Sequence, residues 1–267
     1  MDFVTRTPEV IGWGRKTELT ADVQKARDAA NADPRDPMKW LAYGNALCGM
    51  HLYRNAIEAY SKGIAANPTC GELYRERAHR YVNLWQFAEA EADSVKAAPL
   101  LPEDWSVWYH YTLAMYFQGD YHKAEETSRQ LLRVCKEEWQ TVPPLAWLWR
   151  SLMMQGKKEE ASEVVRSVTP QIAHIDWHED YYDCLMMYKG LVTPEELTAK
   201  VKRTIDDPVF KVCIYAYTVA YGIANYYYLH GNMERYHEML EFELSYAGKN
   251  DTTFGFAGCA AEKALDL

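Results

Sequence analysis

The sequence predicts an all-α protein in which pairs of helices repeat along the chain. Four classes of residue recur at an interval of 34 residues: a large ring at Trp40, Tyr74 and Trp108, a second ring at Tyr53, Phe87 and Tyr121, an alanine at Ala56, Ala90 and Ala124, and a proline at Pro34, Pro68 and Pro102. No stretch shows the alternating pattern of a strand. A fixed period of this length indicates a repeat architecture.

Each recurring position has a physical role in a helix–turn–helix unit. The first ring opens the first helix and wedges against the next unit, and the second ring follows the turn between the helices. The alanine lies where the two helices cross and only a methyl group fits. The proline ends the second helix because it has no N–H to continue the hydrogen-bond ladder. The sequence therefore predicts a tetratricopeptide-repeat (TPR) solenoid, stacked as a right-handed superhelix.

The first elements follow in order from this register. A half repeat at residues 17–36 supplies one helix, about Leu19–Ala32, which Pro34 closes. Repeats are predicted at residues 37–70, 71–104 and 105–138. A three-residue slip at Trp139–Thr141 precedes a fourth repeat at residues 142–171, where Gly156 and Ala161 each lie 37 residues after Gly119 and Ala124. The slip is a change of register between helices, so we expect one continuous solenoid over residues 1–267.

Beyond Thr169 the repeat motif decays, but the helical period continues. Residues 177–246 are predicted to form degenerate repeats, with Pro194 in the first turn of one helix. The expected helices are His178–Lys189, Pro194–Ile205, Val209–Leu229 and Met233–Tyr246. A last helix at residues 254–265 is expected to cap the stack, as terminal repeats must.

The bulk properties exclude several classes of function. The net charge of −9 and the absence of any Lys/Arg run argue against nucleic acid and anionic membrane surfaces as partners. The six cysteines are dispersed without a C-x-x-C pair, which is typical of a reduced cytosolic protein. No apolar signal region and no run of 18 apolar residues is present. A cytoplasmic location is therefore expected.

Several segments resemble a family of bacterial TPR proteins of uncharacterised function. They are Leu73–Ala98, Val107–Ala124, Asp183–Gly190, Tyr221–Asn232 and Phe254–Ala264. The resemblance covers nearly the whole chain, including the degenerate C-terminal third. It implies the fold and no particular activity.

In a TPR stack the first helix of each unit lines the inner groove. Residues at positions 2, 5, 9 and 12 of each repeat share one helical face, with position 6 beside them. The predicted groove residues are Asn45, Arg75, His79, Tyr109, His110, Tyr116, Trp147, Arg150, Tyr221 and Asn225. Arg75 and Arg150 could each grip a carboxylate. The alternative is structural: Arg75 pairs with Glu72, Glu76 or a neighbouring helix, and the histidines and tyrosines form hydrogen bonds within the stack.

The main functional hypothesis is a scaffold or adaptor that binds a peptide or protein segment, acidic or C-terminal, in this groove. Chaperone docking of the lysine–asparagine clamp type is not expected, because only Asn45 matches among the corresponding residues Leu41, Asn45, Glu76, Ser106 and His110. A second hypothesis is a small-molecule or enzymatic pocket formed by Tyr109, His110, His79 and Arg150. A third is a homodimer built through the aromatic C-terminal helices.

Signals for metal binding and catalysis are weak. His174 and His178 are four residues apart and would share a helical face, which makes them weak candidates for metal ligands. The favoured interpretation is that the acidic residues beside them lie at a helix N-terminus, where they need no metal. No nucleophile elbow, P-loop, H-E-x-x-H or G-x-G-x-x-G motif is present. No catalytic residue, metal or cofactor is therefore predicted, and enzymatic activity is not expected.

Overall fold

The computed structural model describes residues 18–172, 178–206 and 214–246, and within these ranges the chain is helical without strands. This confirms the predicted all-α class. In the same ranges no helix is both long enough and apolar enough to cross a membrane. The predicted capping helix at residues 254–265 lies outside the described residues.

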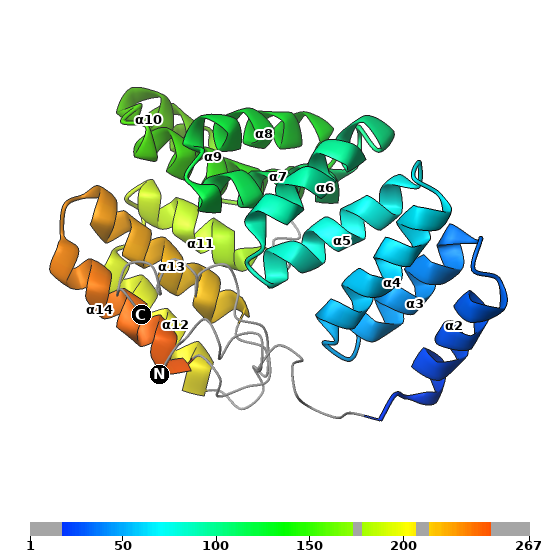
Figure 1. Ribbon diagram of the computed structural model, residues 1–267. Coiled ribbons are helices and arrows are strands. Elements are labelled where there is room, and N and C mark those ends of the chain that lie inside the picture. The colour runs from blue at the N-terminus through cyan, green and yellow to red at the C-terminus, as the bar shows by residue number, and fades with distance from the viewer. Residues whose placement is uncertain (1–17, 173–177, 207–213, 247–267) are drawn as a thin grey trace. The chain divides into compact units, whose positions relative to one another are not determined.

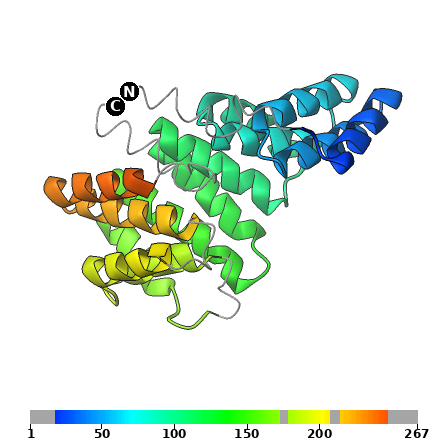
Figure 2. The ribbon, with the colours of Figure 1, turned by 90° about the horizontal axis from the view of Figure 1, so that it is seen from below.

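The chain divides into two compact units, Met1–Ala114 and Met115–Leu267, and the boundary falls inside helix α7 (Trp105–Gln118). The first unit contains α2 (Ala21–Ala32), α3 (Pro37–Cys48), α4 (Tyr53–Ala66), α5 (Gly71–Asn83), α6 (Phe87–Leu100) and the first part of α7. Figures 1 and 2 show α3 beside α4 and α5 beside α6, so consecutive helices form antiparallel pairs.

Two of the three recurring rings of the first unit form a hydrogen bond to the proline that precedes their helix. The indole N–H of Trp40 donates to the carbonyl oxygen of Pro34 at 3.0 Å, and that of Trp108 donates to Pro102 at 2.8 Å. Helices α2, α4 and α6 end at Ala32, Ala66 and Leu100, each two residues before a proline of the series. The tryptophan that opens one helix thus donates a hydrogen bond to the turn that ends the preceding helix.

Close approach of the paired helices depends on small residues. Ala56 and Ala90 have no exposed surface. At Gly44 of α3 a Cβ atom would lie 2.1 Å from the ring of Tyr60 on α4, a distance that no side chain tolerates. Gly44 therefore lets the Tyr60 ring pass against the backbone of α3.

The second unit continues from the end of α7 through α8 (Tyr121–Val134), the 3₁₀ turn η1 (Glu138–Thr141), α9 (Val142–Met154), α10 (Lys158–Ser167), α11 (Glu179–Tyr188), α12 (Pro194–Asp206), α13 (Ile214–Leu229) and α14 (Met233–Tyr246). The turn η1 occupies the position of the predicted register slip. One apolar core joins the last four helices, with Cys184, Leu197, Ile223 and Leu240 among its buried members.

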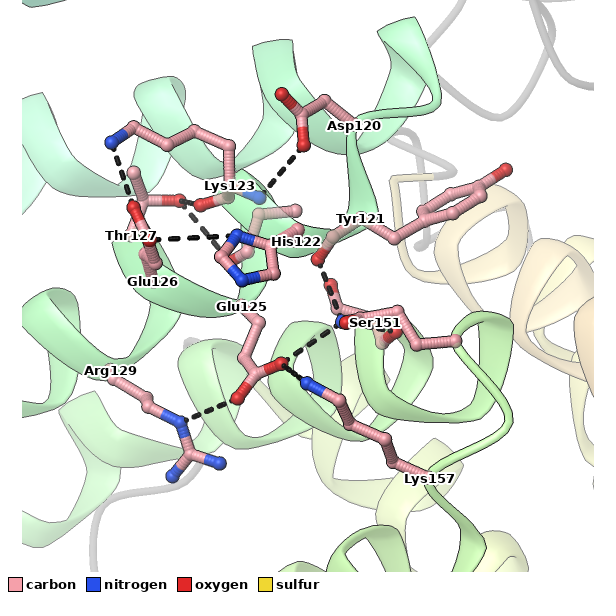
Figure 3. A network of polar contacts seen from close by, with 12 residues as sticks. Asp120, Tyr121, His122, Lys123, Glu125, Glu126, Thr127, Arg129, Ser151 and Lys157 are labelled. Carbon is pink, nitrogen blue, oxygen red and sulfur yellow. Dashed lines mark hydrogen bonds and ion pairs between the residues drawn. The ribbon is translucent and has the colours of Figure 1, made fainter.

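Glu125 connects α8 to the turn that joins α9 and α10 (Figure 3). Its carboxylate accepts hydrogen bonds from Arg129 at 3.0 Å, Lys157 at 2.7 Å and Gln155 at 3.0 Å. Burial alone would raise the pKa of Glu125, but the hydrogen bonds from Lys157, Gln155 and Arg129 outweigh it and lower the pKa. This network lies across the register slip and fixes α8 against the next pair.

Replacing Glu125 with glutamine should lower the free energy of unfolding at pH 7 by about 1–2 kcal/mol, because three donors lose a charged acceptor. Glu126→Gln is the control; its carboxylate is 51% exposed and should matter little. The native pKa of Glu125 lies below its ordinary value of 4.5, so its contribution is present above that value and is lost as the pH falls through the native pKa. Urea unfolding at pH values above and below 4.5 measures this, and a Glu125→Gln deficit that stays constant as the pH falls well below 4.5 would contradict it.

Candidate functional site

Each of the two units contains five of the ten predicted groove residues. Asn45, Arg75, His79, Tyr109 and His110 belong to the first unit. The second unit contains Tyr116, Trp147, Arg150, Tyr221 and Asn225. All five in the second unit are buried, with exposed fractions between 0% and 6%. They form part of a core instead of an open groove.

Arg150 shows most clearly why these residues cannot act at a surface. Its side chain has no exposed area. The guanidinium lies 4.6 Å from the centre of the Trp147 ring and 5.4 Å from that of Tyr221, and its Nε donates to the Tyr188 hydroxyl at 3.1 Å. The expectation that Arg150 grips a carboxylate of a bound segment therefore does not hold in this structure. Arg150 is a buried cation held by aromatic rings.

Helix α13 is the element that covers these positions. Asn225 donates to the Tyr116 hydroxyl at 3.1 Å, and the rings of Tyr221 and Phe117 lie 5.8 Å apart. At Gly222 a Cβ atom would meet Cys184 Sγ at 2.3 Å and Arg150 Nη2 at 3.2 Å. The second unit thus fills its own inner side with a helix that comes about a hundred residues later in the chain.

In the first unit the inner side is covered only in part. We call the side chains of Asn45, Arg75, Glu76, His79 and Tyr109, from α3, α5 and the first part of α7, the inner face. Asn45 is exposed and the other four are half-buried. Tyr60 reaches this face from α4: its hydroxyl donates to Asn45 Oδ1 at 2.7 Å and lies 3.3 Å from Cys48 Sγ. The sequence pattern did not indicate Tyr60, because it belongs to a second helix.

Arg75 is fully engaged within the inner face. Its guanidinium forms ion pairs with Glu76 at 2.9 Å and with Asp104 at 2.8 Å. Burial would lower the pKa of Arg75, but the two carboxylates raise it. This arrangement matches the structural alternative, in which Arg75 pairs with Glu76. A ligand carboxylate would have to displace both partners.

His79 and His110 stack on each other with ring centres 4.0 Å apart. The Nδ1–H of His110 donates to the Ser106 carbonyl at 2.7 Å, whereas Nδ1 of His79 accepts from the Arg80 guanidinium. Burial, with the Arg80 charge next, lowers the pKa of His110 to about 3. Burial and the neighbouring His110 also hold the pKa of His79 well below its usual range. Both rings are neutral near pH 7 and are poor carriers of protons for catalysis.

A second residue at this site that sequence reasoning missed is Arg80. Its side chain is 9% exposed, and its guanidinium lies over the Tyr53 ring at 5.3 Å. Arg80 occupies position 10 of its repeat, outside the positions expected to line a groove. The long side chain of Arg80 brings its guanidinium to His79, and no sequence motif indicates this contact.

One of the two weak metal candidates, His178, lies within the described residues. His178 stacks on Trp139 with ring centres 5.6 Å apart, and burial lowers the pKa of His178 to about 4. His174 lies outside the described residues. Among the residues that the structure describes, no group of three or more His, Cys, Asp or Glu side chains could hold a metal ion.

Comparison with known proteins gives matches among solved structures alone; no protein family and no curated protein matches the sequence. A tetratricopeptide-repeat protein from Parabacteroides merdae ATCC 43184 aligns with a TM-score of 0.58 at 14% identity, covering 98% of this chain and 97% of that one. YrrB, described as a TPR protein with an unusual peptide-binding site, aligns at 0.51 and 13%, covering 92% and 100%. MamA aligns at 0.51 and 17%, covering 61% and 91%. At these identities the similarity concerns the fold.

Proposed function

The chain has the tetratricopeptide-repeat fold, and we propose that it is a protein-interaction scaffold that binds a peptide segment along the inner face. One observation carries the proposal: three successive first helices of the first unit present partly exposed polar and aromatic side chains on one face, from Asn45 through His79 to Tyr109. The matching positions of the second unit are buried by α13. The fold shared with YrrB, which has a peptide-binding site, supports this use of the face.

The proposed partner is a protein and not nucleic acid or a membrane, because the net charge of −9 opposes binding to polyanions. A cytoplasmic location belongs to the same proposal and rests on the dispersed cysteines. The sequence-based expectation of an acidic or C-terminal segment relied on Arg75 and Arg150. Neither supports it now, since Arg75 is paired twice and Arg150 is buried.

The other two hypotheses gain less from the structure. Of the residues suggested for a catalytic or small-molecule pocket, Arg150 is buried in the second unit and the two histidines are uncharged near pH 7. A homodimer would use exposed side chains of the C-terminal helices, of which Tyr228 and Met233 are 42% and 43% exposed. Light scattering that finds a monomer at high concentration would exclude it.

Binding can be tested with octapeptides selected from a random phage-displayed library on the wild-type protein. Asn45→Ala and Tyr109→Ala should each weaken the selected peptides at least ~10-fold in fluorescence anisotropy, because hot-spot side chains carry most of the binding energy. Glu89→Ala and Lys96→Ala, at exposed positions of α6, are the controls and should bind as the wild type does. Equal losses in both pairs, or no loss in the first pair, would contradict the assignment of the face.

A further inference from the structure

Three arginines of α5 differ in how their charges are compensated. Arg75 pairs with Glu76 and Asp104. Arg77 forms a two-pronged pair with Asp93, with both nitrogen–oxygen distances 2.7 Å. Arg80 has no carboxylate partner among the residues that the structure describes, and its Nε has no hydrogen-bond acceptor there. Yet Arg80 is the most buried of the three, at 9% exposed.

The groups around the Arg80 guanidinium are uncharged. It donates to His79 and lies over the Tyr53 ring. Its charge also opposes the effect of burial, which raises the pKa of the Cys48 thiol and the Tyr60 hydroxyl. Both groups are therefore neutral, and so is His79. Cys48, Tyr60 and His79 belong to α3, α4 and α5, respectively.

Glu76 does not supply the missing negative charge. Its Oε1 accepts from both Nε and Nη2 of Arg75, at 3.1 and 2.9 Å. Arg75 also reaches Asp104, which directly precedes α7. The carboxylates of Glu76 and Asp104 are thus engaged by Arg75, and neither forms an ion pair with Arg80.

We propose that Arg80 binds the carboxylate of an aspartate or glutamate side chain in the segment that occupies the inner face; this rests on the proposed function. A guanidinium largely removed from water without a counter-charge is costly, and an incoming carboxylate offsets that cost with charged hydrogen bonds. The sequence analysis assigned the binding of an acidic group to Arg75 and Arg150. We now assign it to Arg80.

The position of Arg80 also selects a side chain over a chain terminus. Helix α5 lies between α3, which contributes Asn45, and α7, which contributes Tyr109. A segment that contacts both residues passes across α5 and continues on either side of it. The carboxylate that meets Arg80 therefore belongs to an internal residue of the segment.

The test uses the selected octapeptides, with each Asp or Glu replaced in turn by Asn or Gln and with the C-terminus free or amidated. On the wild-type protein, one acidic position should lose ~10- to 100-fold in affinity when neutralised, the range expected for a charged hydrogen bond, and amidation should have little effect. On Arg80→Gln the same replacement should cost little. Lys96→Gln is the control, because it removes an exposed positive charge of α6 outside the inner face, and it should keep the full dependence.

Circular dichroism establishes whether Arg80→Gln folds, and Arg80→Lys, which keeps the charge but loses the planar fork, gives a second variant. If neither variant folds, the peptide replacements on the wild-type protein can still overturn the role of Arg80, because that role requires one acidic position. Peptides that bind without dependence on an acidic side chain, or that depend on a free C-terminus instead, would overturn the role of Arg80 and leave the peptide-binding function intact. Failure of every peptide to bind would overturn both.

Discussion

Replacement of Trp147 by alanine is expected to lower the free energy of unfolding of the second unit by about 4 kcal/mol, because a fully buried tryptophan leaves a large cavity. The indole ring contacts Tyr116 and Phe117 at centre distances of 4.9 and 5.6 Å, and its N–H donates to the Tyr181 hydroxyl at 3.2 Å. It also faces the Arg150 guanidinium. The substitution therefore removes packing contacts of Tyr116 and Phe117 and also the cation–π contact of the buried Arg150.

Native-state hydrogen exchange measures this effect separately for each unit, which a single unfolding curve does not. In the Trp147→Ala variant, the protection of backbone amides against exchange should fall in α9, α11 and α13. It should stay unchanged in α3, α4 and α5. The control is Trp139→Ala, since Trp139 is half-buried and stacks on His178, and its loss should cost about 1–2 kcal/mol. Equal losses for the two variants would show that Trp147 is not central to the core of the second unit.

Leucine in place of Ala90 should destabilise the first unit by about 3 kcal/mol, at the upper end of the range for overpacking. Ala90 has no exposed surface and stands at the crossing of the helices of its repeat, where the recurring alanine predicts room for a methyl group only. Ala88→Leu is the matched control, because Ala88 is exposed on the same helix and the substitution is the same.

Hydrogen exchange or urea unfolding distinguishes the two alanine variants. Ala88→Leu should change stability by less than about 0.5 kcal/mol, as surface substitutions do. If Ala90→Leu were as stable as Ala88→Leu, the recurring alanine would not mark a helix crossing, and the physical reading of the repeat would be wrong.

The sequence predicted the fold because the repeat depends on local chemistry. Trp40 and Pro34 are six residues apart and their hydrogen bond closes within one turn region, and the same holds for Trp108 and Pro102. A ring, a methyl group and a proline at a fixed interval thus specify where helices begin, cross and end. The slip at Trp139–Thr141 was also local, and the structure has a 3₁₀ turn there.

The burial of the groove residues in the second unit could not be read from the sequence. Positions within the repeat specify which side of a first helix faces inward, but not what lies against that side. Asn225 and Tyr116 are 109 positions apart, and their hydrogen bond depends on the path of α13. The 34-residue period contains no information on such a contact.

The candidate site in the first unit was predicted in outline and not in its chemistry. Asn45 is exposed and His79 and Tyr109 are half-buried, and their role in binding stays a prediction. The choice of partners was not predictable, because Glu76 and Asp104 could have left Arg75 free, and Arg80 could have taken either of them. Which arginine keeps an uncompensated charge is decided by tertiary packing.

A crystal structure of the wild-type protein with a selected octapeptide tests the central claim most directly. The peptide should lie on the inner face, in contact with Asn45, His79 and Tyr109, with one acidic side chain within hydrogen-bond distance of Arg80. A peptide seated instead on the outer side of α4 and α6, or in the second unit, with Asn45 and Tyr109 untouched, would contradict the account.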